Sequence, residues 1–282
     1  MRVVGLHEDV LVCTSAFWQT TCTVVRGPAV EGRSLGGSAD EGGSSGEPED
    51  EAGALAQREA FVIDSPVLPH ELEALGALLE QVGWPCSGLL ATHGDWDHLL
   101  GRLAFPDAAL GVAETTAARL TGEPGAAARD LRAFDEEHYV ERPRPLGLGQ
   151  LQALPVPGKL EVGAGELELH PTEGHVADGM AIWIPWAGVL VAGDFLSPVE
   201  IPWLDEGGSR SAYRATLERL RPLVEQAAHV VPGHGAVLDG VRAAAILRED
   251  LTYLETLELP LARRSAEQKR IHERNLERIA AE

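Results

Sequence analysis

The sequence predicts an α/β protein in which helices pack outside β-sheet. Two observations lead to this prediction. Apolar residues make up 44% of the 282-residue chain, an ordinary proportion for a protein that folds around its own core. Short apolar runs also alternate with segments whose leucines recur at helical spacing, a mixture that is typical of layered α/β folds.

Two adjacent strands are predicted near the N-terminus, over residues 10–13 and 17–25, where β-branched and aromatic residues are frequent. The pattern stops at residues 27–58, which contain almost no large apolar side chain and carry seven acidic residues against two arginines. Such a composition cannot bury enough apolar surface to offset the entropy of ordering the chain. We therefore expect a disordered, acidic, Gly/Ser-rich insertion between two strands.

Strands and helices alternate from residue 60 onward. A short strand at 61–63 closes on Asp64, and leucines at helical spacing predict a helix over 68–82. A strand at 87–92 follows, and the segment HGDWDH comes directly after it. The same patterns predict helices at 96–104, 114–120, 126–140, 210–227 and 241–258, and strands at 109–113, 151–154, 166–170, 180–184, 188–192 and 229–231.

We expect one domain over residues 1–260, followed by a charged segment at 261–282 that is either an appended helix or a tail. A homodimer formed through this segment is an arrangement that its charge pattern allows. No internal repeat of fixed period is present.

The charge and the cysteines restrict the partners and the compartment. Acidic residues outnumber basic ones by 44 to 23, and the net charge of −21 repels nucleic acid and anionic membranes. The three cysteines form no CxxC pair, as expected in a reducing compartment. No apolar run approaches the roughly 20 residues that a membrane span needs. We expect a cytoplasmic protein that acts on a small molecule.

Side chains that can bind metal ions recur just beyond apolar strands or in glycine-containing turns. A residue at the end of a buried strand is fixed by the sheet, while the loop that follows lets its side chain converge with others. One Gly-His or Gly-Asp step is common in loops, but four such residues within six positions rarely arise on a solvated surface. The candidate ligands are His93, Asp95, Asp97 and His98 in THGDWDH, His175 in EGHVADG, Asp194 in VAGDF, and His234 in VPGHG.

The ordered series HxDxDH, GH, GD and PGHG, preceded by the strand FVID, resembles the metallo-β-lactamase-fold superfamily. The resemblance covers roughly residues 10–258. It implies a four-layer αβ/βα sandwich of two mixed β-sheets with outer helices, and a site for two divalent metal ions, usually zinc, at one edge. Transferred residue by residue, it implies that His93, Asp95 and His175 hold one ion and that Asp97, His98 and His234 hold the second. Asp194 would bridge the two ions. Asp64 would support the metal-binding loop without binding metal itself.

Asp95 departs from the pattern of the superfamily, which usually has histidine at this position. A third carboxylate lowers the formal charge of a two-metal site by one unit, so that bound water should ionise at higher pH. Hard oxygen donors also shift the preference from zinc toward iron or manganese. Flavodiiron proteins resemble this pattern in carrying glutamate at the position, so diiron oxygen chemistry is the alternative function, although no flavin-binding domain follows residue 258.

The resemblance and the ligand series together predict a metal-dependent hydrolase of a small ester, thioester, lactone or related acyl substrate. Asp97 is expected to be catalytic, orienting the nucleophile as well as binding metal. Residues 126–140 and the proline segment after them are placed to form a lid. A metal-free binding protein is the third class left open. The candidate substrate contacts are Trp96, Phe195, Trp203 and His138, with simple covering of the sandwich rim as their alternative role.

Overall fold

The computed structural model describes residues 1–29 and 58–281. The predicted acidic insertion at 27–58 therefore lies almost wholly outside the described residues. Strand β3 ends before it at Arg26, and strand β4 begins after it at Ala60.

Thirteen strands in the described part of the chain form two sheets. The first sheet has the order β1-β2-β3-β4-β5-β6-β7, and the second has the order β13-β12-β11-β10-β9-β8. Both sheets are mixed, since β4 to β7 run parallel to one another and β11 pairs in parallel with β12. The strands are β1 (Arg2–His7), β2 (Val10–Thr14), β3 (Thr21–Arg26), β4 (Ala60–Asp64), β5 (Cys86–Leu90), β6 (Leu110–Ala113), β7 (Leu151–Leu154), β8 (Gly158–Val162), β9 (Gly165–Pro171), β10 (Met180–Ile184), β11 (Val189–Gly193), β12 (His229–Pro232) and β13 (Leu238–Asp239).

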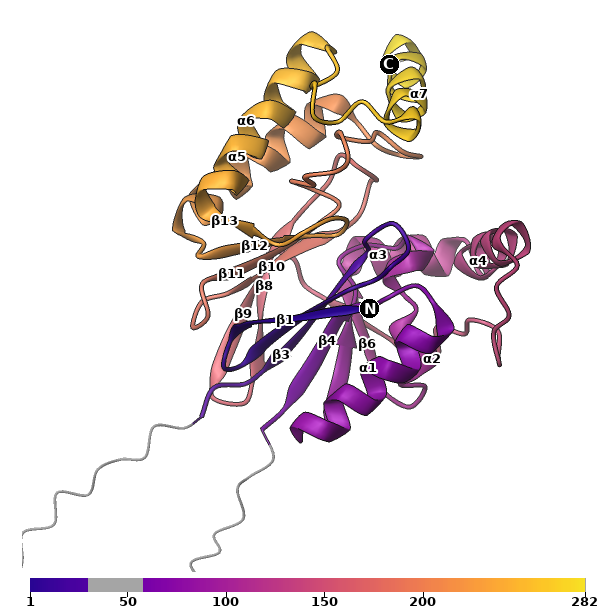
Figure 1. Cartoon of the computed structure of the whole chain (residues 1–282), viewed down its shortest axis with the longest axis vertical. Helices are drawn as coiled ribbons and strands as arrows, with labels where there is room; N and C mark the ends of the chain where they lie inside the picture. The colour runs from indigo at the N-terminus through magenta and orange to yellow at the C-terminus, as the bar shows by residue number, and fades with distance from the viewer. Residues whose placement is uncertain (30–57, 282) are drawn as a thin grey trace, which may run out of the picture.

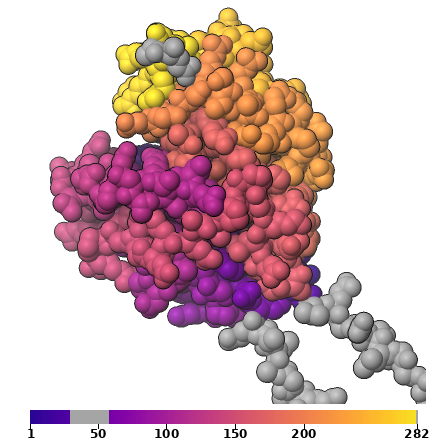
Figure 2. Space-filling model, turned by 180° about the vertical axis from the view of Figure 1, so that it is seen from behind, coloured from indigo at the N-terminus to yellow at the C-terminus, as the bar shows by residue number. Residues whose placement is uncertain are grey.

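Helices cover the outer faces of both sheets. In Figure 1, α1 and α2 lie outside the first sheet, and α5 and α6 lie outside the second. Seen from behind, the C-terminal part of the chain, coloured orange to yellow, gathers at one end of the molecule, and the indigo and purple N-terminal part lies at the other (Figure 2). The helices are α1 (Pro69–Val82), the 3₁₀ helix η1 (Trp96–His98), α2 (Gly101–Ala104), α3 (Glu114–Gly122), α4 (Ala126–His138), α5 (Arg210–Gln226), α6 (Gly240–Thr256) and α7 (Ala266–Ala281).

Side chains alternate between the two faces of each sheet, which explains the layers. On β4, Val62 packs into the core under α1, whereas its neighbour Ile63 packs between the two sheets. On β11, Leu190 contacts the core under α5 and α6, whereas Val191 faces the first sheet. Strands buried on both faces need helices outside them. The predicted α/β sandwich with two mixed sheets and outer helices is thus confirmed.

Some predicted elements differ from those in the structure. The strand predicted at 17–25 begins only at Thr21, because Trp18 and Gln19 take positive φ angles of 52° and 55° and form a turn. The helix predicted at 96–104 is broken into η1 and α2. Strands β1, β8 and β13 have no counterpart among the predicted elements, since they are short or largely exposed. No helix among the described residues is long and apolar enough to cross a membrane.

The two sheets meet at one edge. The backbone N–H of Thr21 donates to the carbonyl of Gly233 (2.8 Å), and the Gly233 N–H donates to the carbonyl of Gly193 (2.6 Å). Gly233 is required there, because a Cβ at this position would lie 2.0 Å from Oδ1 of Asp194. This edge collects the ends of β4, β5, β11 and β12, and the candidate ligands lie on it.

Candidate metal centre

The first part of the centre is the metal loop, residues 93–98, which follows β5. Asp64, at the end of the neighbouring strand β4, supports it: the Thr92 N–H donates to Asp64 Oδ1 (2.8 Å) and the Thr92 hydroxyl donates to Oδ2 (2.9 Å). Asp64 Oδ2 also lies 3.0 Å from His98 Nδ1. Asp64 therefore faces the back of the loop and fixes how the His98 ring is turned.

The second part comes from three later loops. His175 lies between β9 and β10, Asp194 directly follows β11, and His234 follows β12. Nδ1 of His175 lies 2.9 Å from the carbonyl of Trp203, and Nδ1 of His234 lies 3.3 Å from the carbonyl of Trp18. These contacts occupy one nitrogen of each ring and leave Nε2 directed at the carboxylates.

The seven predicted ligands converge. Asp194 is central: its Oδ2 lies 3.7, 3.4 and 3.4 Å from Nε2 of His93, His175 and His234, and its Oδ1 lies 3.2 Å from Nε2 of His98. Their donor atoms form three groups, each close enough to hold an ion: His93, Asp95 and His175; Asp97, His98 and His234; and His93, His98 and Asp194.

Asp95 and Asp97 complete the two outer groups. Asp95 Oδ2 lies 3.3 Å from His93 Nε2 and 3.2 Å from His175 Nε2. Asp97 Oδ2 lies 3.5 Å from His234 Nε2. These groups have the composition that was expected for the two metal positions.

Unpaired buried atoms test whether a metal fits here. Among the described residues, Nε2 of His93, Nε2 of His98 and Oδ1 of Asp194 are buried and make no hydrogen bond. Such atoms are costly without a partner, and all three point into the cluster. Imidazole nitrogens and carboxylate oxygens suit zinc, iron and manganese alike. The donor set fits divalent cations.

The imidazoles and carboxylates of the centre shift one another's pKa values. Burial opposes charging of the imidazoles, yet the hydrogen bond with Asp95 raises the pKa of His175 to about 9. Glu200 and Asp194 likewise raise the pKa of His234 to about 10 against the effect of burial. Burial alone would raise the pKa of Asp95, but His93 and His175 hold it well below its usual range. The carboxylates therefore favour the protonated forms of His175 and His234.

Sequence analysis missed three residues around the centre. Arg119, on α3, donates to Oδ1 of Asp95 (2.8 Å) and to Oδ1 of Asp178 (2.9 Å). Asp178 also accepts the Gly94 N–H through Oδ2 (3.0 Å). A signal for Asp178 was its place three residues after His175, whereas nothing local distinguishes Arg119 from other helix arginines.

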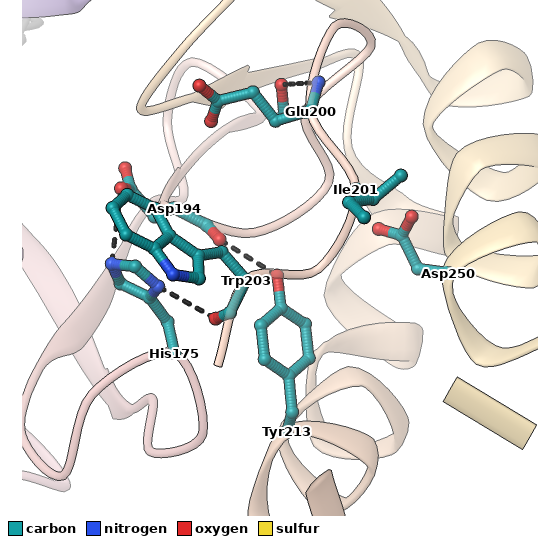
Figure 3. A pocket seen from close by; sticks show the side chains of 8 residues that line it. His175, Asp194, Glu200, Ile201, Trp203, Tyr213 and Asp250 are labelled. Carbon is teal, nitrogen blue, oxygen red and sulfur yellow. Dashed lines mark hydrogen bonds and ion pairs between the residues drawn. The ribbon is translucent and has the colours of Figure 1, made fainter. Parts of the chain in front are cut away.

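The third missed residue is Glu200. It lines a cavity with His175, Asp194, Trp203 and Tyr213, and its carboxylate lies toward the side of Asp194 and His175 (Figure 3). Burial raises the pKa of Glu200. The Tyr213 hydroxyl donates to the Asp194 carbonyl (2.9 Å) and so closes the opposite side of this cavity.

Two of the four candidate substrate contacts, Trp96 and Trp203, lie beside the candidate ligands, and a third, His138, packs against Phe134. Trp96 is half-buried, with its ring centroid 4.7 Å from that of Phe134, and His138 is exposed, with its ring centroid 4.6 Å from Phe134. Trp203 is half-buried, with its ring 5.6 Å from that of His175.

The fourth candidate, Phe195, is placed differently from the expectation. Its side chain is 3% exposed and packs in the core, with its ring centroid 4.3 Å from that of Tyr213. The backbone after Asp194 turns this side chain away from the surface. Trp18 was missed, although it is 47% exposed and its ring lies 5.7 Å from that of Trp96.

Comparisons with known proteins identify the fold and the family. The structure is similar to a metallo-beta-lactamase from Pontibacter korlensis (TM-score 0.58, 15% identity, covering 90% of this chain and 99% of that one). It is also similar to the DIM-1 metallo-beta-lactamase exposed to ceftazidime (TM-score 0.54, 19% identity, covering 91% and 97%). No curated protein matches the sequence. A family model described as the metallo-beta-lactamase superfamily matches residues 57–234. The chain belongs to the metallo-beta-lactamase superfamily.

Proposed function

We propose that the protein is a metal-dependent hydrolase of a small ester, thioester, lactone or related acyl substrate. One observation carries the proposal: seven imidazole and carboxylate side chains from four segments converge, and buried nitrogens among them lack a hydrogen-bond partner within the described residues. The superfamily match supports a hydrolase. The net charge of −21 favours a small substrate over nucleic acid.

The residues divide into two sets around Asp194. His93, Asp95 and His175 would hold one ion, and Asp97, His98 and His234 the other, with Asp194 between them. Two divalent ions held by these residues would supply a water of lowered pKa and an electrophile for a scissile carbonyl. Asp97 would orient the attacking water as a proton acceptor.

The aromatic surface beside the metal loop suggests where the substrate lies. Trp18 and His138 are exposed, and both contact the aromatic cluster that contains Trp96 and Phe134. Flat apolar side chains of this kind bind aromatic or acyl groups. We therefore expect an acyl chain or ring on this side and the scissile bond over Asp194.

Metal analysis combined with an acyl-substrate panel tests the proposal. We expect two equivalents of zinc or manganese and turnover of p-nitrophenyl esters, thioesters or lactones, reduced at least about 100-fold in Asp97→Asn and His98→Ala. Asp107→Asn, at an exposed position between α2 and β6, is the matched control. Two iron atoms with an oxygen-sensitive visible spectrum would instead indicate diiron oxygen chemistry, and full turnover in Asp97→Asn with metal bound would contradict the role of Asp97.

A further inference from the structure

Arg119 contacts the one ligand that departs from the superfamily pattern. Its guanidinium group spans two carboxylates, donating to Oδ1 of Asp95 (2.8 Å) and to Oδ1 of Asp178 (2.9 Å). Asp178 in turn accepts the Gly94 N–H (3.0 Å), so that the arginine and the metal loop share a partner. The Arg119 side chain is 33% exposed, and Asp95 is 19% exposed.

The two carboxylate oxygens of Asp95 have different partners. Oδ1 is occupied by the guanidinium group, whereas Oδ2 lies 3.3 Å from Nε2 of His93 and 3.2 Å from Nε2 of His175. The rigid guanidinium group bridges Asp95 and Asp178 with one charge-assisted hydrogen bond to each, which restrains the Asp95 carboxylate relative to α3. Asp95 can therefore offer one oxygen to a cation while the other stays bound to the protein.

The contact also changes the charge of the centre. A carboxylate in place of histidine adds one negative charge, and a guanidinium group in direct contact adds one positive charge. Counted together, Asp95 and Arg119 add no net charge relative to a neutral imidazole, while Asp178, the second partner of Arg119, contributes its own negative charge in either case. The weaker Lewis acidity expected from the third carboxylate is offset in the same way. The preference for iron or manganese is not offset, because the donor atom of Asp95 is still an oxygen.

We infer that Asp95 and Arg119 act as one unit: a carboxylate ligand that carries its own counter-ion and replaces the neutral histidine expected at this position. Arg119 is a positioning residue, since it acts on the cation only through Asp95. This inference rests on the proposed function of the site as a metal centre.

A charge-swap series tests the unit, with zinc as the probe and competition against a chromophoric chelator at one neutral pH as the readout. Arg119→Gln leaves the extra negative charge uncompensated, so we expect the full-length protein to bind the first zinc about tenfold more tightly. Asp95→His removes one negative charge beside the cation and leaves Arg119 paired with Asp178 alone, so we expect zinc to bind at least about tenfold more weakly. The double variant Asp95→His/Arg119→Gln restores the net charge and is expected to return within about threefold of the wild type.

Two further variants separate charge from folding. Arg119→Lys keeps the positive charge and is expected to bind zinc as the wild type does, despite the loss of the two-pronged geometry. Arg221→Gln removes an arginine of similar exposure that pairs with Glu218 on α5, and we expect it to leave zinc affinity unchanged. Melting temperatures of the metal-free proteins show that each variant is folded.

Three results would overturn the inference while leaving the metal centre intact. They are weaker zinc binding by Arg119→Gln, tight zinc binding by Asp95→His alone, and independent effects of the two substitutions in the double variant. A wild-type protein that binds no zinc, iron or manganese would instead contradict the proposed function itself.

Discussion

The candidate metal centre has two halves: the metal loop (residues 93–98), and the later loops that carry His175, Asp194 and His234. Different parts of the chain hold the two halves in place. The metal loop is supported by its immediate surroundings, since Asp64 and Thr92 lie at the ends of adjacent parallel strands. The loop after Asp194 is supported from the C-terminal segment. There Gln268 accepts the Ile201 N–H (2.7 Å), 67 positions away, and Asn275 accepts the Leu204 N–H (2.9 Å), 71 positions away.

The C-terminal support reaches a candidate ligand in two steps. Asn275 binds both neighbours of Trp203, donating to the Pro202 carbonyl (2.7 Å) and accepting from Leu204. The Trp203 carbonyl lies 2.9 Å from Nδ1 of His175. The segment at 261–282, which was expected as an appended helix or a tail, therefore contains a helix that fixes the orientation of His175. The difference teaches that one half of the centre depends on local sequence and the other on a distant helix.

The largest effect is expected from breaking the anchor of the C-terminal segment. Arg263 donates to Asp250 Oδ1 (2.5 Å) and to the carbonyl of Glu200 (2.6 Å), and both charged side chains are almost fully buried. Arg263→Ala leaves the Asp250 carboxylate buried without its partner, so we expect the free energy of unfolding to fall by about 3–5 kcal/mol. Urea denaturation measures this.

The neighbouring residue provides the control for that experiment. Arg264 is exposed and donates only to the carbonyl of Leu259, so Arg264→Ala is expected to cost less than about 0.5 kcal/mol. If Arg263→Ala were as stable as Arg264→Ala, the C-terminal segment would not be an anchor for this half.

The next effect concerns the metal loop. Asp64→Ala removes the acceptor of the Thr92 N–H and the partner of His98, so we expect a loss of about 2–3 kcal/mol in unfolding free energy. Zinc bound by the second set of ligands should weaken about 10-fold to 100-fold. Chelator competition measures this, with the exposed Asp107→Ala as control. Unchanged zinc affinity would show that the loop keeps its geometry without Asp64.

A smaller effect is expected from loosening the distant support alone. Asn275→Ala removes the hydrogen bonds to Leu204, Pro202 and the Tyr253 hydroxyl, and we expect a loss of about 2 kcal/mol. The ion held by His175 should bind several-fold more weakly, whereas the ion held by His98 and His234 should be unaffected. Titration of the metal-free protein with two equivalents of zinc separates the two steps. Equal weakening of both steps would show a general loss of folding instead.

The same contrast explains what the sequence could predict. The ligands follow strand ends within short glycine-containing motifs, so local pattern and resemblance were sufficient to find them. Arg119 and Asn275 act on partners 24 and 71 positions away, and no periodicity records such contacts. Phe195 packs in the core, and the positive φ of Leu196 (62°) directly after it belongs to a turn that no local sequence pattern indicates. Strands that are continuous apolar runs, such as β10 and β11, were predicted closely.

The smallest effect is expected from pH, and it concerns the two histidines of the second half. In the metal-free protein, neighbouring carboxylates raise the pKa of His175 to about 9 and that of His234 to about 10, both above the ordinary value near 6.5. The folded state therefore binds these protons more tightly than the unfolded state. Their stabilising contribution is complete below about pH 6.5 and is lost as the pH rises through 9 and 10.

Zinc should reverse this dependence, because only the neutral imidazole binds a cation. We expect the melting temperature of the metal-free protein to fall by roughly 5 °C between pH 6.5 and 9.5, while that of the zinc-loaded protein stays level or rises. Calorimetry in buffers of different ionisation enthalpy should record proton release on zinc binding at pH 7. If the stability of the metal-free protein instead rose over this range, the carboxylates would not hold protons on His175 and His234. The imidazoles would then be neutral, and able to bind a cation, before metal is added.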